Sequence, residues 1–158
     1  MSTHLAPPLP ALRSKTVATW LTLLGGPMGV HRFYLYGLQD IWGWLHPIPT
    51  LIGAWGLGRV SDFGQDDQLA WLLIPVLGFM VAGTMLQAIV YGLTPDERWH
   101  ERHNAGRDIS SARPSGWGAI IGVILALLVG ATVLMSTIAF SGQRYFEYQV
   151  EEARKISQ

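Results

Sequence analysis

The chain has 158 residues, of which 49% are hydrophobic and only 14% charged, against about 25% charged in a typical soluble domain. Its 11 basic and 11 acidic residues cancel, which argues against nucleic acid as a partner because no excess of positive charge is present. The chain contains no cysteine, which excludes disulfide bonds, thiolate metal ligands and a cysteine nucleophile.

The N-terminal part of the chain is predicted to be a flexible arm followed by a short apolar segment. Residues 1–12 include three prolines, which lack the backbone donor that a helix needs. No basic start leads directly into an apolar core, so we expect no signal peptide. Residues 16–30 are apolar but short for a membrane span, and Gly25-Gly26-Pro27 interrupts them near their end.

A second apolar segment, residues 41–58, is interrupted by His46, Pro47 and Pro49. Proline removes helical hydrogen bonds and kinks a helix, and such breaks persist in a membrane only where other groups bind the freed backbone atoms. We therefore predict that residues 13–63 form a hairpin whose second helix is kinked near Pro47. His46 is expected to bond a carbonyl that the kink sets free.

Two longer segments, residues 69–93 and 114–143, contain no charged residue at all. Each exceeds the roughly 20 apolar residues that cross a bilayer as a helix. Asp66 and Asp67 precede the first of them and are typical helix caps. Residues 64–143 are thus predicted to form a second helix pair. The chain is then an all-α integral membrane protein with four transmembrane helices, a kinked hairpin plus two longer spans.

The polar loop between the long spans, residues 94–115, is predicted to contain a short interfacial helix. Thr94 as a cap, a proline in the first position and Glu97 three residues after the cap fit a helix start, and the helix is expected to run to about His103. His100 and His103 lie three residues apart on it, but neither a third ligand nor an HExxH pattern accompanies them. We interpret both histidines as exposed surface residues and predict no metal site.

Beyond the last span, residues 144–158 have apolar side chains at helical spacing and are predicted to form an amphipathic tail. We identify no repeat with a fixed period along the chain. Four crossings would leave six basic residues on one side of the membrane and five on the other, so the preference of basic residues for the cytoplasmic side leaves the orientation open.

Residues 13–62 carry a set of residues known from one membrane family. Arg13-Ser14-Lys15 opens the set, Gly26 and Gly29 space a turn before His31-Arg32-Phe33-Tyr34-Leu35, and Trp55 and Asp62 close it. In these positions the chain resembles the TM-two domain family, whose members have a short pair of membrane helices joined by a tight loop. The resemblance implies a bacterial, multi-pass protein of the cytoplasmic (inner) membrane, with no known active site.

Four residues of this loop form a candidate contact site for lipid or for a protein partner: His31, Arg32, Phe33 and Asp40. The Arg32 guanidinium follows a glycine-rich break, where it can anchor the hairpin by reaching the membrane surface. It can equally bind a lipid phosphate or a partner. Asp40 is its expected counter-charge across the turn.

Small residues recur at every fourth position of the last span: Gly118, Gly122, Ala126 and Gly130. This spacing places them on one helix face, where they let another helix backbone approach closely. The partner helix is either the span at residues 69–93 of the same chain or the same span of another copy, and the sequence leaves both open.

These features predict a non-enzymatic membrane protein that acts as a structural or interaction module and needs no cofactor. Its expected partners are membrane lipids and either a second copy of the chain or another membrane protein. A channel or carrier for a small solute or ion is the alternative, suggested by the prolines around His46, although transporters usually hold an ionisable residue within their spans. A membrane enzyme that uses His31, Arg32 and Asp40 on lipid head groups is the third interpretation.

Overall fold

The computed structural model describes residues 11–157, whose regular elements are all helical. The predicted arm, residues 1–12, lies almost entirely outside the described residues. In chain order the elements are α1 (Lys15–Gly25), the 3-10 helix η1 (Gly26–Met28), α2 (Val30–Tyr36), α3 (Ile41–Leu45), α4 (Pro47–Phe63), α5 (Gln68–Leu93), α6 (Asp96–His103) and α7 (Trp117–Ile156). The all-α prediction is confirmed for this part of the chain.

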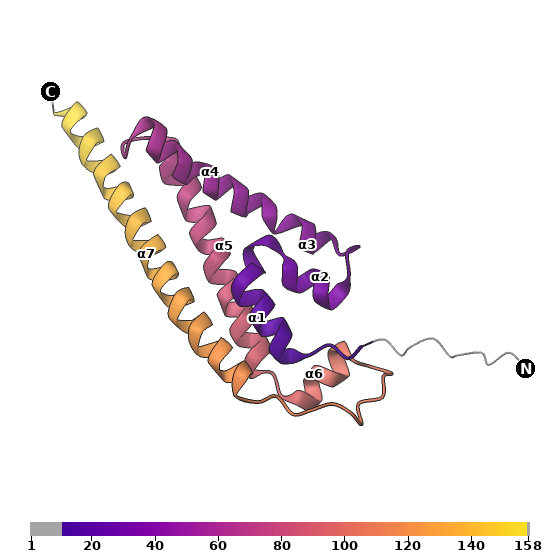
Figure 1. Cartoon of the computed structure of the whole chain (residues 1–158). Coiled ribbons are helices and arrows are strands. Elements are labelled where there is room, and N and C mark those ends of the chain that lie inside the picture. Colours follow the sequence, from indigo (N-terminus) through magenta and orange to yellow (C-terminus); the bar gives the residue numbers. More distant parts are fainter. Residues whose placement is uncertain (1–10, 158) are drawn as a thin grey trace, which may run out of the picture.

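Two long antiparallel helices, α5 and α7, run side by side and carry the other elements (Figure 1). At 1.5 Å per residue, the 26 residues of α5 extend over about 39 Å and the 40 residues of α7 over about 60 Å. Both helices are long and apolar enough to cross a membrane. They correspond to the two spans predicted at residues 69–93 and 114–143.

The first two predicted spans take a different form, so the prediction of four transmembrane helices is wrong in this respect. α1 has 11 residues and extends over about 16 Å, roughly half of the 30 Å hydrocarbon core of a bilayer. The chain then turns through η1 and comes back as α2 (Figure 1). The second segment is divided at His46 into α3 and α4. Among the described residues, two helices, α5 and α7, have the length and hydropathy of a spanning helix.

The kink in the second segment lies where the prolines predict it. His46 separates α3 from α4, and its Nδ1 lies 2.6 Å from the carbonyl oxygen of Trp42, one helical turn earlier. The predicted bond to a backbone carbonyl is therefore confirmed. The hydroxyl of Thr50 lies 2.6 Å from the Pro27 carbonyl oxygen in η1 and 3.0 Å from that of His46. One side chain thus ties the α1–α2 turn to the kinked helix.

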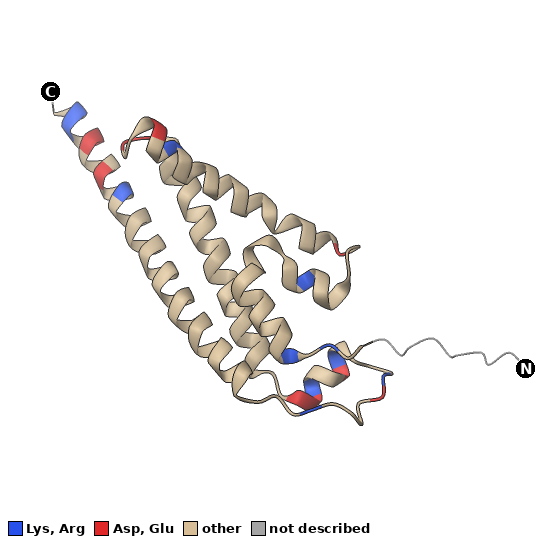
Figure 2. Ribbon diagram, viewed as in Figure 1, with Lys and Arg blue, Asp and Glu red and all other residues tan. Residues whose placement is uncertain are grey.

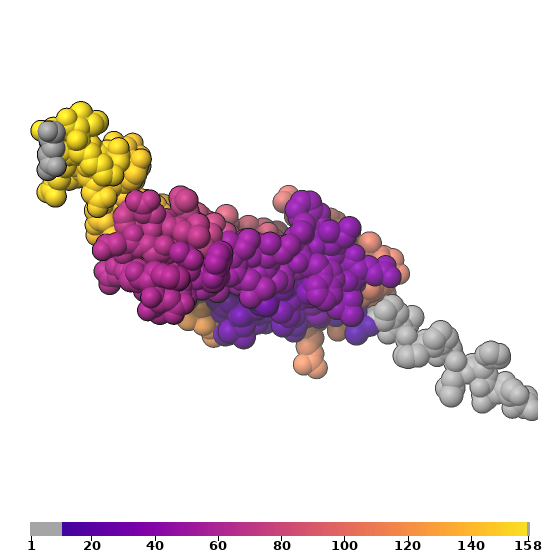
Figure 3. Space-filling view, turned by 90° about the horizontal axis from the view of Figure 1, so that it is seen from above, coloured from indigo at the N-terminus to yellow at the C-terminus, as the bar shows by residue number. Residues whose placement is uncertain are grey.

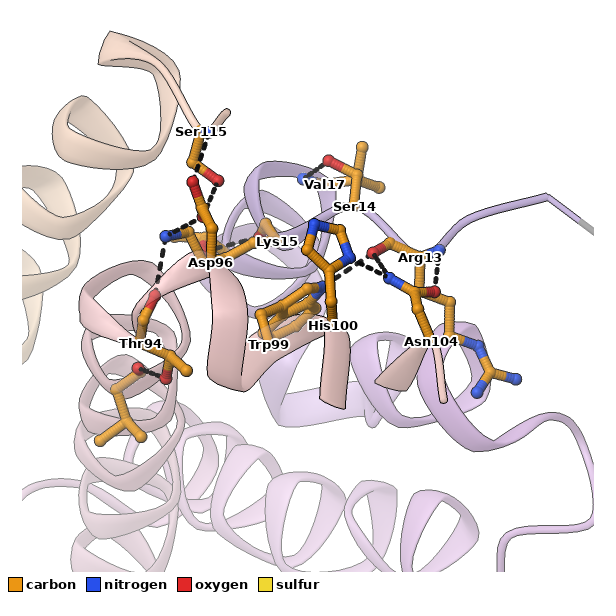
Figure 4. Close-up of polar contacts among 12 residues, drawn as sticks. Arg13, Ser14, Lys15, Val17, Thr94, Asp96, Trp99, His100, Asn104 and Ser115 are labelled. Atoms are coloured by element: carbon orange, nitrogen blue, oxygen red, sulfur yellow. Dashed lines mark hydrogen bonds and ion pairs between the residues drawn. The ribbon is translucent and has the colours of Figure 1, made fainter. Parts of the chain in front are cut away.

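The start of α1 is held against the end of α5 by Lys15, whose side chain is 9% exposed (Figure 4). Its Nζ donates to the Thr94 carbonyl at 2.8 Å and lies 2.7 Å from Asp96 Oδ1. The last carbonyls of a helix lack partners within the helix and attract a cation. Lys15 therefore gives the Thr94 carbonyl, at the end of α5, a hydrogen-bond partner. Four crossings would put Lys15 and Asp96 on opposite sides of a membrane, which is incompatible with their contact.

The small-residue stripe predicted on the last span faces other helices of the same chain. The stripe consists of Gly118, Gly122, Ala126 and Gly130. A Cβ built on Gly122 would lie 2.9 Å from the Thr19 side chain of α1, and one built on Gly130 would lie 2.7 Å from the Met85 side chain of α5. The stripe therefore packs within the chain, and its partners include α1, which the sequence did not indicate.

Charged side chains gather at the two ends of the helical body (Figure 2). One end is formed by the start of α1 with α6 and its adjoining loop, and the other by the α4–α5 turn and the last turns of α7. Between the ends, α2 carries Arg32 and the turn after it carries Asp40. α7 continues as one helix through the predicted tail, residues 144–158, as far as Ile156. Its C-terminal part stands clear of the other helices (Figure 3).

Replacing Gly122 by leucine should lower the free energy of unfolding by about 1–3 kcal/mol, because the added side chain collides with Thr19 at a close helix crossing. Gly142→Leu on the same helix is the matched control, since nothing lies within 4 Å of a Cβ built there. The control should leave stability unchanged or slightly raised, because leucine is the better helix former. Denaturant unfolding of the detergent-solubilised chain measures both, and equal stabilities would contradict the packing described.

Candidate functional site

A bidentate ion pair closes the turn between α2 and α3. Arg32 Nε lies 2.6 Å from Asp40 Oδ2 and Nη2 lies 3.1 Å from Oδ1, and the two side chains are 24% and 12% exposed. The guanidinium also lies over the Tyr36 ring, 4.9 Å from its centroid. Phe33 packs on the same turn, with its ring centroid 5.0 Å from that of Trp44. The planar fork of arginine matches both carboxylate oxygens in a way that lysine cannot.

Glycines at both ends of α2 set the geometry of this turn. Gly29, which precedes α2, has φ +75°, and a Cβ there would collide with the Gly43 carbonyl of α3. Gly37, which follows α2, has φ +85°, and other residues rarely adopt a positive φ. Asp40 then caps α3 by accepting a hydrogen bond from the Gly43 amide at 3.0 Å. The carboxylate that pairs with Arg32 therefore also starts the next helix.

The same arrangement occurs a second time at the turn between α4 and α5. Arg59 Nε lies 2.7 Å from Asp67 Oδ2 and Nη2 lies 2.9 Å from Oδ1. Gly64 ends α4 with φ +88°, and Asp67 caps α5 by accepting from the Ala70 amide at 3.1 Å, as predicted. The hydrogen bonds from Arg59 lower the pKa of Asp67. We call these two arrangements the first and the second Arg–Asp clamp.

Both clamps follow one sequence pattern, Arg-x4-Gly-x2-Asp-x3-Trp, which begins once in α2 and once in α4. In each, the tryptophan indole donates to the carbonyl of the residue six positions earlier: Trp44 to Leu38 at 2.9 Å, and Trp71 to Gln65 at 2.8 Å. Two copies do not make a repeat with a fixed period along the chain, so that prediction is not contradicted, but this motif was missed in the sequence.

His31 does not take part in the first clamp, although the sequence grouped it with Arg32. Its side chain is 2% exposed, and its ring centroid lies 5.4 Å from that of His46 and 6.0 Å from that of Tyr91. Its Nδ1 is buried and has no hydrogen-bond partner among residues 11–157. Of the four predicted contact residues, Arg32, Phe33 and Asp40 thus lie together at the turn, whereas His31 lies in the interior beside α5.

α6 is fastened to the chain just before α1 by two buried side chains (Figure 4). Trp99, which is 2% exposed, donates its indole hydrogen to the Arg13 carbonyl at 2.7 Å. Asn104, also 2% exposed, accepts from the Arg13 amide at 2.8 Å and donates to the Arg13 carbonyl at 3.1 Å. The short helix predicted in this loop is confirmed, and these bonds fix it beneath the start of α1.

Asp96, the first residue of α6, links this helix to the start of α1 and to the loop that precedes α7. It pairs with Lys15 and accepts hydrogen bonds from the Ser115 amide at 2.9 Å and the Ser115 hydroxyl at 2.7 Å. Burial acts to raise the pKa of Asp96, but the hydrogen bonds from Lys15 and Ser115 outweigh it and lower the pKa to about 2. The predicted cap was wrong, because the Thr94 hydroxyl donates to the Val90 carbonyl of α5 at 2.6 Å.

His103 is buried, at 7% exposed, so its interpretation as a surface residue is wrong. Its ring centroid lies 4.3 Å from that of Trp99 and 6.0 Å from that of Tyr36. Burial, together with the charges of Arg102 and Arg13, lowers the pKa of His103, so the imidazole is neutral at neutral pH. The signal for its burial was the spacing of Trp99 and His103, four residues apart on one face of a helix.

A cavity of about 170 Å³ lies between α2, α5 and α6. We call it the Arg32 cavity, and its polar lining consists mainly of Arg32, Tyr36, Gln87, Tyr91, Arg102 and His103. It forms because the docking of α6 brings three of its residues, Trp99, Arg102 and His103, to the side of α2. Of the predicted contact residues, Arg32 alone lines it. The candidate site is therefore this cavity together with the first clamp.

Comparison of the chain with sequence models of protein families, with curated proteins and with solved structures finds no match. The resemblance of residues 13–62 to the TM-two domain family therefore stays a prediction. The function of the site has to be inferred from its own geometry.

The two clamps allow a matched test of the ion pairs. Arg32→Gln and Asp40→Asn should each lower the thermal stability of the purified chain, and the double variant should lose clearly less than the sum of the two, because both changes remove one interaction. Arg59→Gln with Asp67→Asn should show the same non-additivity at the second clamp. Strictly additive losses in either cycle would mean that the ion pair there contributes nothing.

Proposed function

We propose that this chain is a non-enzymatic integral membrane protein that acts as a structural or interaction module. In this proposal it crosses the membrane three times, as α3–α4, α5 and α7. α1 and α2 form a re-entrant hairpin that enters and leaves the membrane at the same side. The resemblance to the TM-two domain family supports the bacterial cytoplasmic membrane as its location.

The observation that carries the proposal is the apolar surface of these helices. Large apolar side chains point outward along them: Leu72 is 72% exposed, and Trp42, Leu128 and Met135 are each 64% exposed. Soluble monomers rarely expose contiguous apolar patches of more than a few hundred Å², whereas a helix in hydrocarbon requires such a surface. α5 and residues 117–143 of α7 also carry no charged side chain.

The break in the hairpin is compatible with a bilayer because its polar groups find partners in the protein. Non-helical backbone persists at membrane depth only where protein groups or water bind it. The Pro27 carbonyl accepts a hydrogen bond from Thr50 at 2.6 Å. The buried hydroxyls of Thr19 and Thr22 donate to carbonyls one turn earlier in α1, at 3.0 and 2.7 Å. The hairpin can therefore leave water without unpaired groups at these positions.

Three crossings change how the basic residues are shared between the two sides. The side that holds the start of α1 and α6 has seven of them, because α2 brings Arg32 back to it, and the other side has four: Arg13, Lys15, Arg32, Arg98, Arg102, Arg107 and Arg113, against Arg59, Arg144, Arg154 and Lys155. Basic residues favour the cytoplasmic side. The proposal therefore puts α6 in the cytoplasm and the C-terminal part of α7 on the opposite side.

Membrane lipids are the partners that the apolar surface fits. A protein partner would be contacted by α6 or by the part of α7 that stands clear of the other helices (Figure 3). A homo-oligomer would need a face other than the small-residue stripe, because α1 and α5 cover positions such as Gly122 and Gly130.

Single cysteines test the three crossings directly, because the chain has none of its own. Ala11→Cys and Ser110→Cys should react with a membrane-impermeant maleimide from the cytoplasmic side alone. Asp66→Cys and Ser157→Cys should react from the opposite side alone. Labelling of spheroplasts and of inverted membrane vesicles measures the side of each residue.

Leu127→Cys is the control for this experiment, because its exposed side chain faces the hydrocarbon in the proposed topology and should react from neither side. Labelling of Ala11→Cys and Ser157→Cys from the same side would contradict three crossings. Release of the chain from membranes by alkaline carbonate would contradict membrane insertion altogether.

A further inference from the structure

The Arg32 cavity holds two guanidinium groups with hydrogen-bonding capacity that the chain itself does not use. Asp40 accepts from Nε and Nη2 of Arg32, and among residues 11–157 no group accepts from its Nη1. Arg102 is exposed and forms no ion pair with the described part of the chain. The residues that line the cavity include no carboxylate. Because Asp40 balances the charge of Arg32, the uncompensated positive charge in its wall is that of Arg102.

A buried imidazole in the same wall favours an anion as the ligand. His103 lines the cavity and is 7% exposed, and its Nδ1 has no hydrogen-bond partner within residues 11–157. A buried polar atom left unpaired costs free energy. Because Nδ1 itself is buried, the ring has to turn about its Cβ–Cγ bond before a hydrogen at Nδ1 can reach an oxyanion in the cavity. The same oxyanion would offset the positive charges of Arg102 and Arg13 beside it.

An apolar groove of about 710 Å³ adjoins the cavity along the end of α5 and α6. Ile89 and Leu93 line its apolar part, and Arg98 and Arg102 line its polar part. The carboxylate of Glu101 also lines it and is outnumbered by the two arginines. Three residues line both the groove and the cavity: Val90, Thr94 and Arg102. A positively charged cavity that continues into an apolar groove matches a molecule with an anionic head and a hydrocarbon chain.

We propose that this site binds an anionic phospholipid, with the phosphate in the Arg32 cavity and an acyl chain along the groove. Arg102 and Nη1 of Arg32 bind the phosphate oxygens, His103 donates a hydrogen bond to one of them, and Ile89 and Leu93 contact the chain. The inference rests on the membrane insertion proposed above and adds a headgroup class to it. A free phosphate ion would use the same polar groups and leave the groove unoccupied.

Native mass spectrometry of the full chain, released from detergent with phosphatidylglycerol or phosphatidylcholine, measures this binding. The unsubstituted chain should retain phosphatidylglycerol in preference to phosphatidylcholine. Arg102→Gln should weaken retention of phosphatidylglycerol by roughly tenfold or more, because a hydrogen bond between charged groups is lost.

Arg113→Gln is the matched control for Arg102→Gln. It removes one positive charge from the same end of the chain, but its side chain lines a different cavity, so it should retain lipid as the unsubstituted chain does. Equal losses in the two variants would overturn the site, because the attraction would then be general to the charged surface.

His103→Phe separates binding from folding. The phenyl ring keeps the aromatic contacts of His103 and removes a buried nitrogen that lacks a partner. The variant should lose retention of phosphatidylglycerol severalfold, while its unfolding midpoint in phosphatidylcholine stays unchanged or rises. Retention at the level of the unsubstituted chain would overturn the role of His103 and with it the site.

Inorganic phosphate distinguishes the two sources of the anion. An excess of phosphate should leave phosphatidylglycerol bound to the unsubstituted chain, and displacement would overturn the lipid assignment in favour of a free anion. The maleimide labelling from each side of the membrane is repeated on single-cysteine chains that also contain Arg102→Gln. If the labelling pattern is as proposed but no chain prefers phosphatidylglycerol, the lipid site is rejected and the proposed function stands. If the unsubstituted chain does not insert into the membrane, the proposed function itself is rejected.

Discussion

The arrangement of the chain depends on the Lys15 side chain at the end of α5. With its ammonium between the Thr94 carbonyl and the Asp96 carboxylate, α1 has to start where α5 ends. α1 has only 11 residues, and the glycines around Pro27 turn the chain back before it reaches the end of the helical body at the α4–α5 turn. This turn places Arg32 beside α6, and the cavity between α2, α5 and α6 follows from it.

The two Arg–Asp clamps show how one turn can be used in two ways. At the second clamp the Arg59 guanidinium lies over Phe63 and Trp55, 4.6 and 5.5 Å from the ring centroids, so its exposed face is covered by its own helix. At the first clamp α6 adds Arg102 and His103, and a polar cavity results. Stability of the turn and binding in the cavity are therefore separable, and the second clamp is an internal reference for the first.

The features that depend on neighbouring residues were predictable from the sequence, and those that depend on distant contacts were not. Arg32 and Asp40 are eight residues apart across a glycine turn, so their pairing follows from local geometry, as does the kink beside Pro47. The contact between Lys15 and Asp96 has no local signal, and without it each apolar segment was taken as a full crossing. His103 was assigned to the surface because it is buried only by the packing of α6 against α2 and α5.

A disulfide between α1 and α7 tests the central claim, that α1 begins where α7 begins. A Cβ built on Gly118 would lie 3.1 Å from Thr16 Cγ2, so a sulfur in the place of Cγ2 would lie near enough to the sulfur of Gly118→Cys for a disulfide. In native membranes under mild oxidation, Thr16→Cys with Gly118→Cys should form an intramolecular disulfide that removes both free thiols, whereas Thr16→Cys with Gly142→Cys should form none. Free thiols at 16 and 118 that react from opposite sides of the membrane would contradict the account.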